Sequence, residues 1–213
     1  MKLRNCWLAG CLAAGLALSP LGLADSHEEA LSSLKERWEH IVTEMPSSQR
    51  RSALESLSGE ASSLAGAHSS EADAWLWKGI VLASHAQERG GMGALGLARD
   101  ARDALERAIR LDPRGDNGSA YVTLGALYDR VPGRPLGFGN SNTAEQMFRQ
   151  ALEIRPGGID VNYYYAVFLE DEGRTGEARK HASRAVEGLA REQRERSDES
   201  LREEARRFLA TLR

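Results

Sequence analysis

The chain has 213 residues, of which 28% are charged and 41% hydrophobic, and its formal net charge is −3. This length suits one domain or a short helical array. The mildly acidic mixture of both charge signs argues against nucleic acid and anionic lipid as partners. Both cysteines, Cys6 and Cys11, lie near the start, so the remaining sequence offers no disulfide, thiol nucleophile or cysteine-bound metal.

Residues 1–24 have the pattern of a cleaved secretion signal. A positively charged start precedes an apolar run that ends at Pro20, and small residues just before the cut predict cleavage after Ala24. The run is shorter than the roughly 20 residues that span a bilayer. We therefore expect an exported, periplasmic bacterial protein with no membrane span in the mature chain. The Leu-Ala-Gly-Cys sequence ending at Cys11 leaves lipoprotein anchoring as the less favoured alternative.

Residues 25–69 are predicted to form an N-terminal helical hairpin. Apolar residues recur at helical spacing on each side of Pro46, which marks the turn.

Residues 70–192 contain three units of similar pattern, each read as a pair of antiparallel helices. Small residues at three- and four-residue spacing let the paired helices approach closely, and prolines end two of the helices. The residues that define the pattern are, in the first unit, Trp75, Gly79, Ala101, Ala108 and Pro113; in the second, Tyr121, Leu124, Gly125, Tyr128, Ala144, Phe148, Ala151 and Pro156; and in the third, Gly173, Ala178 and Ala185. The pattern resembles the tetratricopeptide repeat (TPR).

The first two units are longer than the third, with extra residues between their two helices. We expect inserted loops at 88–98 and 131–142. Successive pairs stack in parallel, so both loops are predicted to lie side by side at one edge, where such insertions often form a binding face. Ordered connectors that pack on each other are the structural alternative.

Residues 193–213 are predicted to form a C-terminal capping helix, because their apolar stripe is backed by an Arg- and Glu-rich face. No stretch alternates apolar and polar residues as a β-strand would. The expected fold is therefore all-α: a TPR-like superhelical solenoid of antiparallel helix pairs with a C-terminal cap.

The sequence gives no indication of an enzyme or of a cofactor. Residues 91–96 match the G-x-G-x-x-G pattern, but the preceding strand that a dinucleotide site needs is missing. The five histidines have no zinc-binding spacing, and no serine lies in a G-x-S-x-G turn. We expect no catalytic residue, no metal and no cofactor.

The candidate contact residues lie in the two loops and in an aromatic cluster of the third unit. Glycines and prolines in the loops hold apolar side chains at defined positions, and tyrosine is favoured in protein contacts. Core packing is the competing interpretation for the aromatic cluster. The candidates for binding a partner or ligand are Met92, Arg134, Phe138, Asn140, Asn162, Tyr163 and Tyr164.

The loop sequence at 131–139, Val-Pro-Gly-Arg-Pro-Leu-Gly-Phe-Gly, is similar to that of exported TPR proteins known as the T component of TRAP-type transporters. Arg134 departs from that pattern, in which an aromatic residue is expected. The resemblance implies a non-enzymatic periplasmic adaptor that binds a protein, such as the transporter's solute receptor, and that also self-associates. The alternatives are a small-ligand carrier with a pocket under the glycine-rich loops and a scaffold for cell-envelope assembly.

Overall fold

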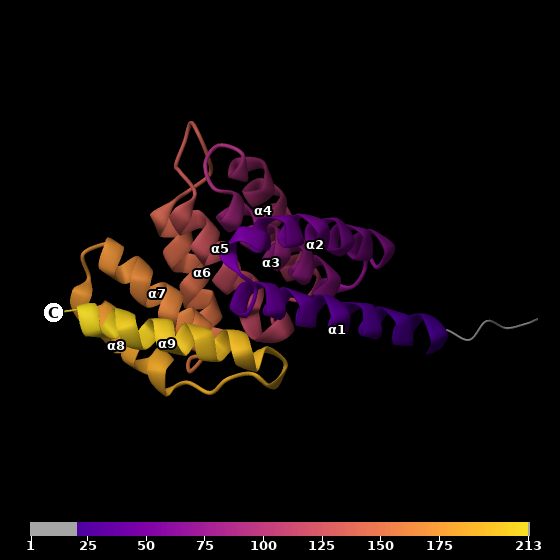
Figure 1. Ribbon diagram of the computed structural model, residues 1–213. Coiled ribbons are helices and arrows are strands. Elements are labelled where there is room, and N and C mark those ends of the chain that lie inside the picture. The colour runs from indigo at the N-terminus through magenta and orange to yellow at the C-terminus, as the bar shows by residue number, and fades with distance from the viewer. Residues whose placement is uncertain (1–20, 213) are drawn as a thin grey trace, which may run out of the picture.

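The computed structural model describes residues 21–212, and all regular structure in this range is helical (Figure 1). The predicted all-α class is therefore confirmed. The elements in chain order are α1 (Leu21–Thr43), α2 (Ser47–Ala67), α3 (Ala72–Arg89), α4 (Ala94–Leu111), η1 (Gly115–Gly118), α5 (Ser119–Arg130), α6 (Ser141–Ile154), α7 (Ile159–Asp171), α8 (Thr175–Glu187), η2 (Glu192–Arg194) and α9 (Glu195–Thr211).

Helices α3/α4, α5/α6 and α7/α8 pack as three successive pairs, in the three units that the sequence pattern predicts. The pairs are tight because small residues face each other. At Gly125, a Cβ atom would lie 2.7 Å from Cε1 of Phe148 on the opposite helix, so no larger residue fits without movement. The repeat-defining residues that are at most 3% exposed are Ala101, Ala108, Leu124, Ala144, Phe148, Ala151, Ala178 and Ala185.

The turn residues of the pattern also lie where expected. Pro113 and Pro156 each follow the last residue of a helix by two positions, after α4 and α6. Gly173 separates α7 from α8 with φ of 74°, a left-handed conformation that favours glycine. Trp75 is half-buried and lies at the margin of the hydrophobic core. Its ring packs under the side chains of Lys78 and Arg107.

The loop predicted at 88–98 is wrong in extent. Most of the extra residues of the first unit lengthen its helices, because α3 continues to Arg89 and α4 begins at Ala94. Only residues 90–93 connect them, and Gly90 and Gly91 both have φ of 60°. In the second unit, residues 131–140 separate α5 from α6, close to the predicted insertion.

Helix α1 begins at Leu21 and so crosses the predicted cleavage point after Ala24. The rest of the predicted signal, with Cys11, lies outside the described residues. Within residues 21–212, no helix combines the length and hydropathy that a membrane span needs.

Candidate functional site

The two connecting segments Gly90–Gly93 and 131–140 lie side by side at one edge of the molecule, here called the loop edge (Figure 1). Arg99, in the first turns of α4, donates from Nη2 to the carbonyl oxygen of Leu136 at 3.2 Å. This contact joins residues 37 positions apart. Loop 131–140 thus packs on the first turns of α4, and both segments border one cavity through residues 90–92 and through Val131 and Pro132.

Residues 131–140 fold into a compact loop with its own hydrogen bonds. Gly139 N donates to Pro132 O at 3.0 Å, and Asn140 N donates to Tyr128 O at 2.8 Å. A Cβ atom at Gly139 would lie 1.8 Å from the carbonyl oxygen of Val131, so this position requires glycine. The loop thus presents its side chains from a fixed backbone.

Two of the predicted contact residues are used inside this loop. Phe138 is half-buried, with its ring edge-on to Tyr128 at 5.3 Å between centroids and under the guanidinium of Arg102 at 4.8 Å. Asn140 caps α6, since its side-chain oxygen accepts a hydrogen bond from Thr143 N at 2.9 Å. Both side chains therefore support the loop.

The side chains that the loop edge exposes are different ones. Met92 is 73% exposed and Leu136 is 57% exposed, while Arg134 also faces solvent. Large exposed apolar side chains on neighbouring segments mark a contact surface more often than isolated ones do. Leu136 was not among the predicted site residues, although its place between prolines and glycines in an insertion was a usable signal.

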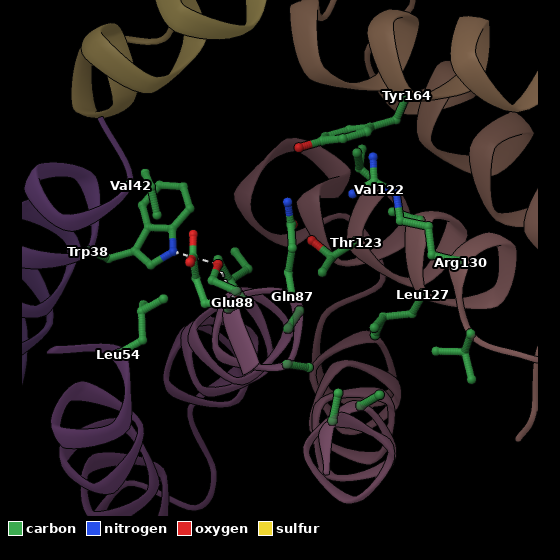
Figure 2. A pocket seen from close by; sticks show the side chains of 18 of the residues that line it. Trp38, Val42, Leu54, Gln87, Glu88, Val122, Thr123, Leu127, Arg130 and Tyr164 are labelled. Atoms are coloured by element: carbon green, nitrogen blue, oxygen red, sulfur yellow. Dashed lines mark hydrogen bonds between the residues drawn. The ribbon is translucent and has the colours of Figure 1, made fainter. Parts of the chain in front are cut away.

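Beside the loop edge, the concave side of the helix array forms a cavity of about 740 Å³. The first helix of each pair (α3, α5 and α7) lines it, together with parts of α1, α2, α9 and η2 and the start of α4. Figure 2 shows Gln87, Thr123 and Tyr164 directed into this space, with Trp38 and Leu54 on the opposite wall. A pocket was expected beneath residues 90–96 and 133–140. Five residues of the first segment line the cavity, whereas none of 133–140 does and Val131 and Pro132 lie there instead.

Contact between the two ends of the array closes the cavity on one side. Ser197 N donates to Oε1 of the buried Glu39 at 2.9 Å, and Arg196 pairs with Glu44 at 2.7 Å. These bonds join α9 to α1 across more than 150 residues. The C-terminal helix, predicted as a cap only, therefore also completes the wall of the cavity.

A buried ionic cluster fixes the C-terminal segment under the cavity. Asp160 is 3% exposed and pairs with Arg191 at 3.0 Å and with Arg155. Arg191 also pairs with Asp198 at 2.6 Å. Burial opposes ionisation of Asp160, but the charges of Arg191 and Arg155 outweigh it and lower the pKa of its carboxyl from 3.8 to about 2.

Arg194 lies next to this cluster and lines the cavity; it forms no direct ion pair with a described residue, although the charges of Asp160, Asp116 and Asp198 act on it. It is 8% exposed, and its guanidinium stacks over Trp38 at 4.9 Å and Trp77 at 5.5 Å. Its Nε atom is buried without a hydrogen-bond partner. Burial, followed by the charge of Arg191, lowers its pKa, but a guanidinium still stays protonated in proteins.

The three candidates from the aromatic cluster have different places. Asn162 is fully buried: its amide donates to Pro156 O and Gly158 O at 2.8 Å, and its Oδ1 lies 2.8 Å from Nδ1 of His181. Its predicted position facing a groove is wrong, because an amide at this helix start satisfies the turn instead.

The two tyrosines lie between α7 and neighbouring elements. Tyr163 donates to Glu204 on α9 at 3.0 Å, so it ties two helices together. Tyr164 lines the cavity, and Figure 2 shows its hydroxyl directed into it. Burial raises the pKa of Tyr164, so its hydroxyl stays a hydrogen-bond donor.

Among the described residues, no group of three or more His, Cys, Asp or Glu side chains is arranged to hold a metal ion.

Comparison with known proteins gives a structural match. No protein-family model matches the chain, and no curated protein matches it. Among solved structures, it is similar to TTC0263, a thermophilic TPR protein of Thermus thermophilus, with a TM-score of 0.56 at 16% sequence identity. The match covers 89% of this chain and 94% of that chain. At this identity the likeness shows the fold: the chain has a TPR-like fold of sequential antiparallel helix pairs.

Proposed function

We propose that this protein is a non-enzymatic adaptor that binds a protein partner at the loop edge. The observation that carries the proposal is the exposure of Met92, just before α4, and of Leu136, in a hydrogen-bonded loop that packs on the first turns of α4. Burying two such side chains against a partner would contribute about 1.5–3 kcal/mol each. A preformed loop also loses little conformational entropy on binding.

The non-enzymatic part of the proposal rests on how the buried polar groups are used. Asp160 is held by arginines, and the hydroxyl of Ser58 lies 3.2 Å from Nδ1 of the buried His85. The Ser58 hydroxyl donates its hydrogen bond to Leu54 O at 2.7 Å, and both Ser58 and His85 are buried, which supports a structural role for this pair over a nucleophile with its base.

For cellular context, we propose export to the periplasm, and a solute-binding protein of a TRAP-type transporter as the partner. The signal-like residues 1–24 and the loop sequence at 131–139 support this assignment. Self-association through the same edge is the second kind of contact that the exposed side chains allow.

Site-specific photo-crosslinking in cells tests the adaptor proposal. A photoreactive residue is placed at Met92 or Leu136, and matched controls carry it at Leu111 or Leu189, which are 41% and 87% exposed but lie away from the loop edge. We expect one and the same protein to be cross-linked from both loop-edge positions and from neither control. Equal cross-linking from all four positions, or none from Met92 and Leu136, would contradict a partner site at this edge.

A small-ligand carrier is the second candidate function, and the cavity favours it. Its volume of about 740 Å³ lies within the range of small-molecule sites, and aromatic, apolar and polar side chains converge on it.

A further inference from the structure

The cavity lining combines an apolar body with hydrogen-bond donors. Trp38, Val42 and Leu54 form one wall, and Val122 and Leu127 contribute to the other (Figure 2). A ligand with a hydrocarbon or aromatic portion would therefore remove apolar surface from water on both sides.

The carboxylates that line the cavity already have partners. Asp160 is paired with Arg191 and Arg155, Glu88 lies 3.9 Å from Arg50, and Glu204 accepts the hydroxyl of Tyr163. The negative groups are thus engaged within the protein.

Two arginines of the cavity, Arg194 and Arg130, are held by aromatic rings instead of by direct ion pairs. Arg194 rests on two indole rings and Arg130 on the ring of Tyr164 at 5.3 Å, and neither forms an ion pair within the described residues. The Tyr164 hydroxyl is directed into the cavity (Figure 2), where it can donate to a ligand. The charges of Asp160, Asp116 and Asp198 favour the charged form of Arg194, but its buried Nε has no acceptor, and a buried donor without an acceptor is costly for the fold. An anion bound beside Arg194 would supply that acceptor.

We propose that the cavity binds a small organic anion with an apolar body, and that the anionic group pairs with Arg194. The inference rests on the carrier candidate and specifies its ligand class. Tyr164 donates a further hydrogen bond to the same group, and the wall at Trp38 and Leu54 holds the apolar part. Charge-assisted hydrogen bonds make the anionic group the selective element, since a neutral molecule of the same length would gain only the apolar contacts.

The test compares two probes that differ in charge, octanoate and octan-1-ol, on the purified full chain without any partner. Binding is followed by isothermal titration calorimetry and by tryptophan fluorescence, because Trp38 lines the site. We expect saturable one-to-one binding of octanoate, tighter than that of octan-1-ol by about tenfold or more. Equal affinity for the two probes would overturn the anion inference while leaving a neutral-ligand carrier standing.

Variants assign the preference to Arg194. Arg194→Met keeps an unbranched apolar side chain over the indole rings and should abolish the preference for octanoate. Arg206→Met, on the exposed side of α9, is the matched control and should keep it. If Arg194→Met does not fold, Tyr164→Phe is measured instead and should weaken octanoate binding without affecting octan-1-ol.

An octanoate preference that survives undiminished in Arg194→Met would refute the proposed anchor. Where Tyr164→Phe replaces that variant, octanoate binding as tight as in the wild type would refute the proposed anion site. If neither probe binds, the carrier candidate fails together with this inference. The adaptor proposal is judged separately by cross-linking at the loop edge.

Discussion

A methyl group added at Gly125 should destabilise the protein through a single contact. The new Cβ atom would lie 2.7–2.9 Å from three ring atoms of Phe148. That ring is fully buried and has Tyr165 and Phe168 at 5.6 and 5.8 Å between centroids, so it has little room to move. Overpacking of this kind costs about 1–3 kcal/mol, partly offset by the roughly 1 kcal/mol by which alanine favours a helix over glycine.

Gly59→Ala is the matched control, since Gly59 lies in the interior of α2 with no atom within 4 Å of the added Cβ. Both variants gain the same helix propensity, so their difference isolates the contact with Phe148. For a chain of this size, 1 kcal/mol corresponds to about 2–4 °C in Tm. By thermal unfolding followed with circular dichroism, Gly125→Ala should melt about 2–12 °C below Gly59→Ala. A Gly125→Ala protein that melts at or above the control would refute the assigned pairing of α5 with α6.

Three further predictions concern charge, pH and the loop edge. Asp160→Asn should lower the free energy of unfolding by about 3–5 kcal/mol in urea titrations, because Arg155 loses its carboxylate and Arg191 keeps only Asp198. The wild-type carboxylate contributes fully above about pH 3.8, and this contribution is lost as the pH falls toward 2. Burial lowers the pKa of His85 and of His181 below 6.5. The free energy of unfolding should therefore be highest above about pH 6.5 and fall below it, because the unfolded chain binds protons more readily there. A His85→Gln/His181→Gln variant should show a flatter dependence of Tm on pH from about 7.5 to 5.5. Phe138→Ala should lower Tm because the ring packs on its neighbours, whereas Arg134→Ala should leave Tm unchanged; equal melting of the two variants would contradict the loop packing.

The repeat architecture was predictable because it depends on local spacing. Alanines at three- and four-residue intervals, and the pairing of Gly125 with Phe148, allow two helices to pack closely. This spacing can be recognised within each unit of the sequence. The end of each pair was equally visible, since Pro113 and Pro156 cannot continue a helix. These features involve residues within one unit, so one sequence suffices to identify them.

The extent of the first connection was not predictable from the same pattern. Counting residues shows that the first unit is longer than its neighbour, but the count does not tell whether the extra residues form a loop or lengthen the two helices. Helix-favouring residues around Ala86 and Ala98 turned out to continue α3 and α4.

The cavity depends on contacts that sequence spacing does not reveal. Arg194 reaches Trp38, and Ser197 reaches Glu39, only because the curvature of the stacked pairs brings the last helix back to the first. The position predicted for Asn162 was wrong for a related reason. Helical spacing predicts the direction of its side chain but does not reveal that its amide donates to the carbonyl oxygens of Pro156 and Gly158.

Whether the loop edge binds a protein is the central question, and an affinity measurement answers it most directly. The partner identified by cross-linking is titrated against the wild type, a Met92→Ser/Leu136→Ser variant and a Leu111→Ser/Leu189→Ser control, each checked for unchanged Tm. We predict that the loop-edge variant binds at least about tenfold more weakly, because two exposed apolar side chains lose their contacts, while the control binds like the wild type. Unchanged affinity of the Met92→Ser/Leu136→Ser variant would contradict the adaptor function proposed for this edge.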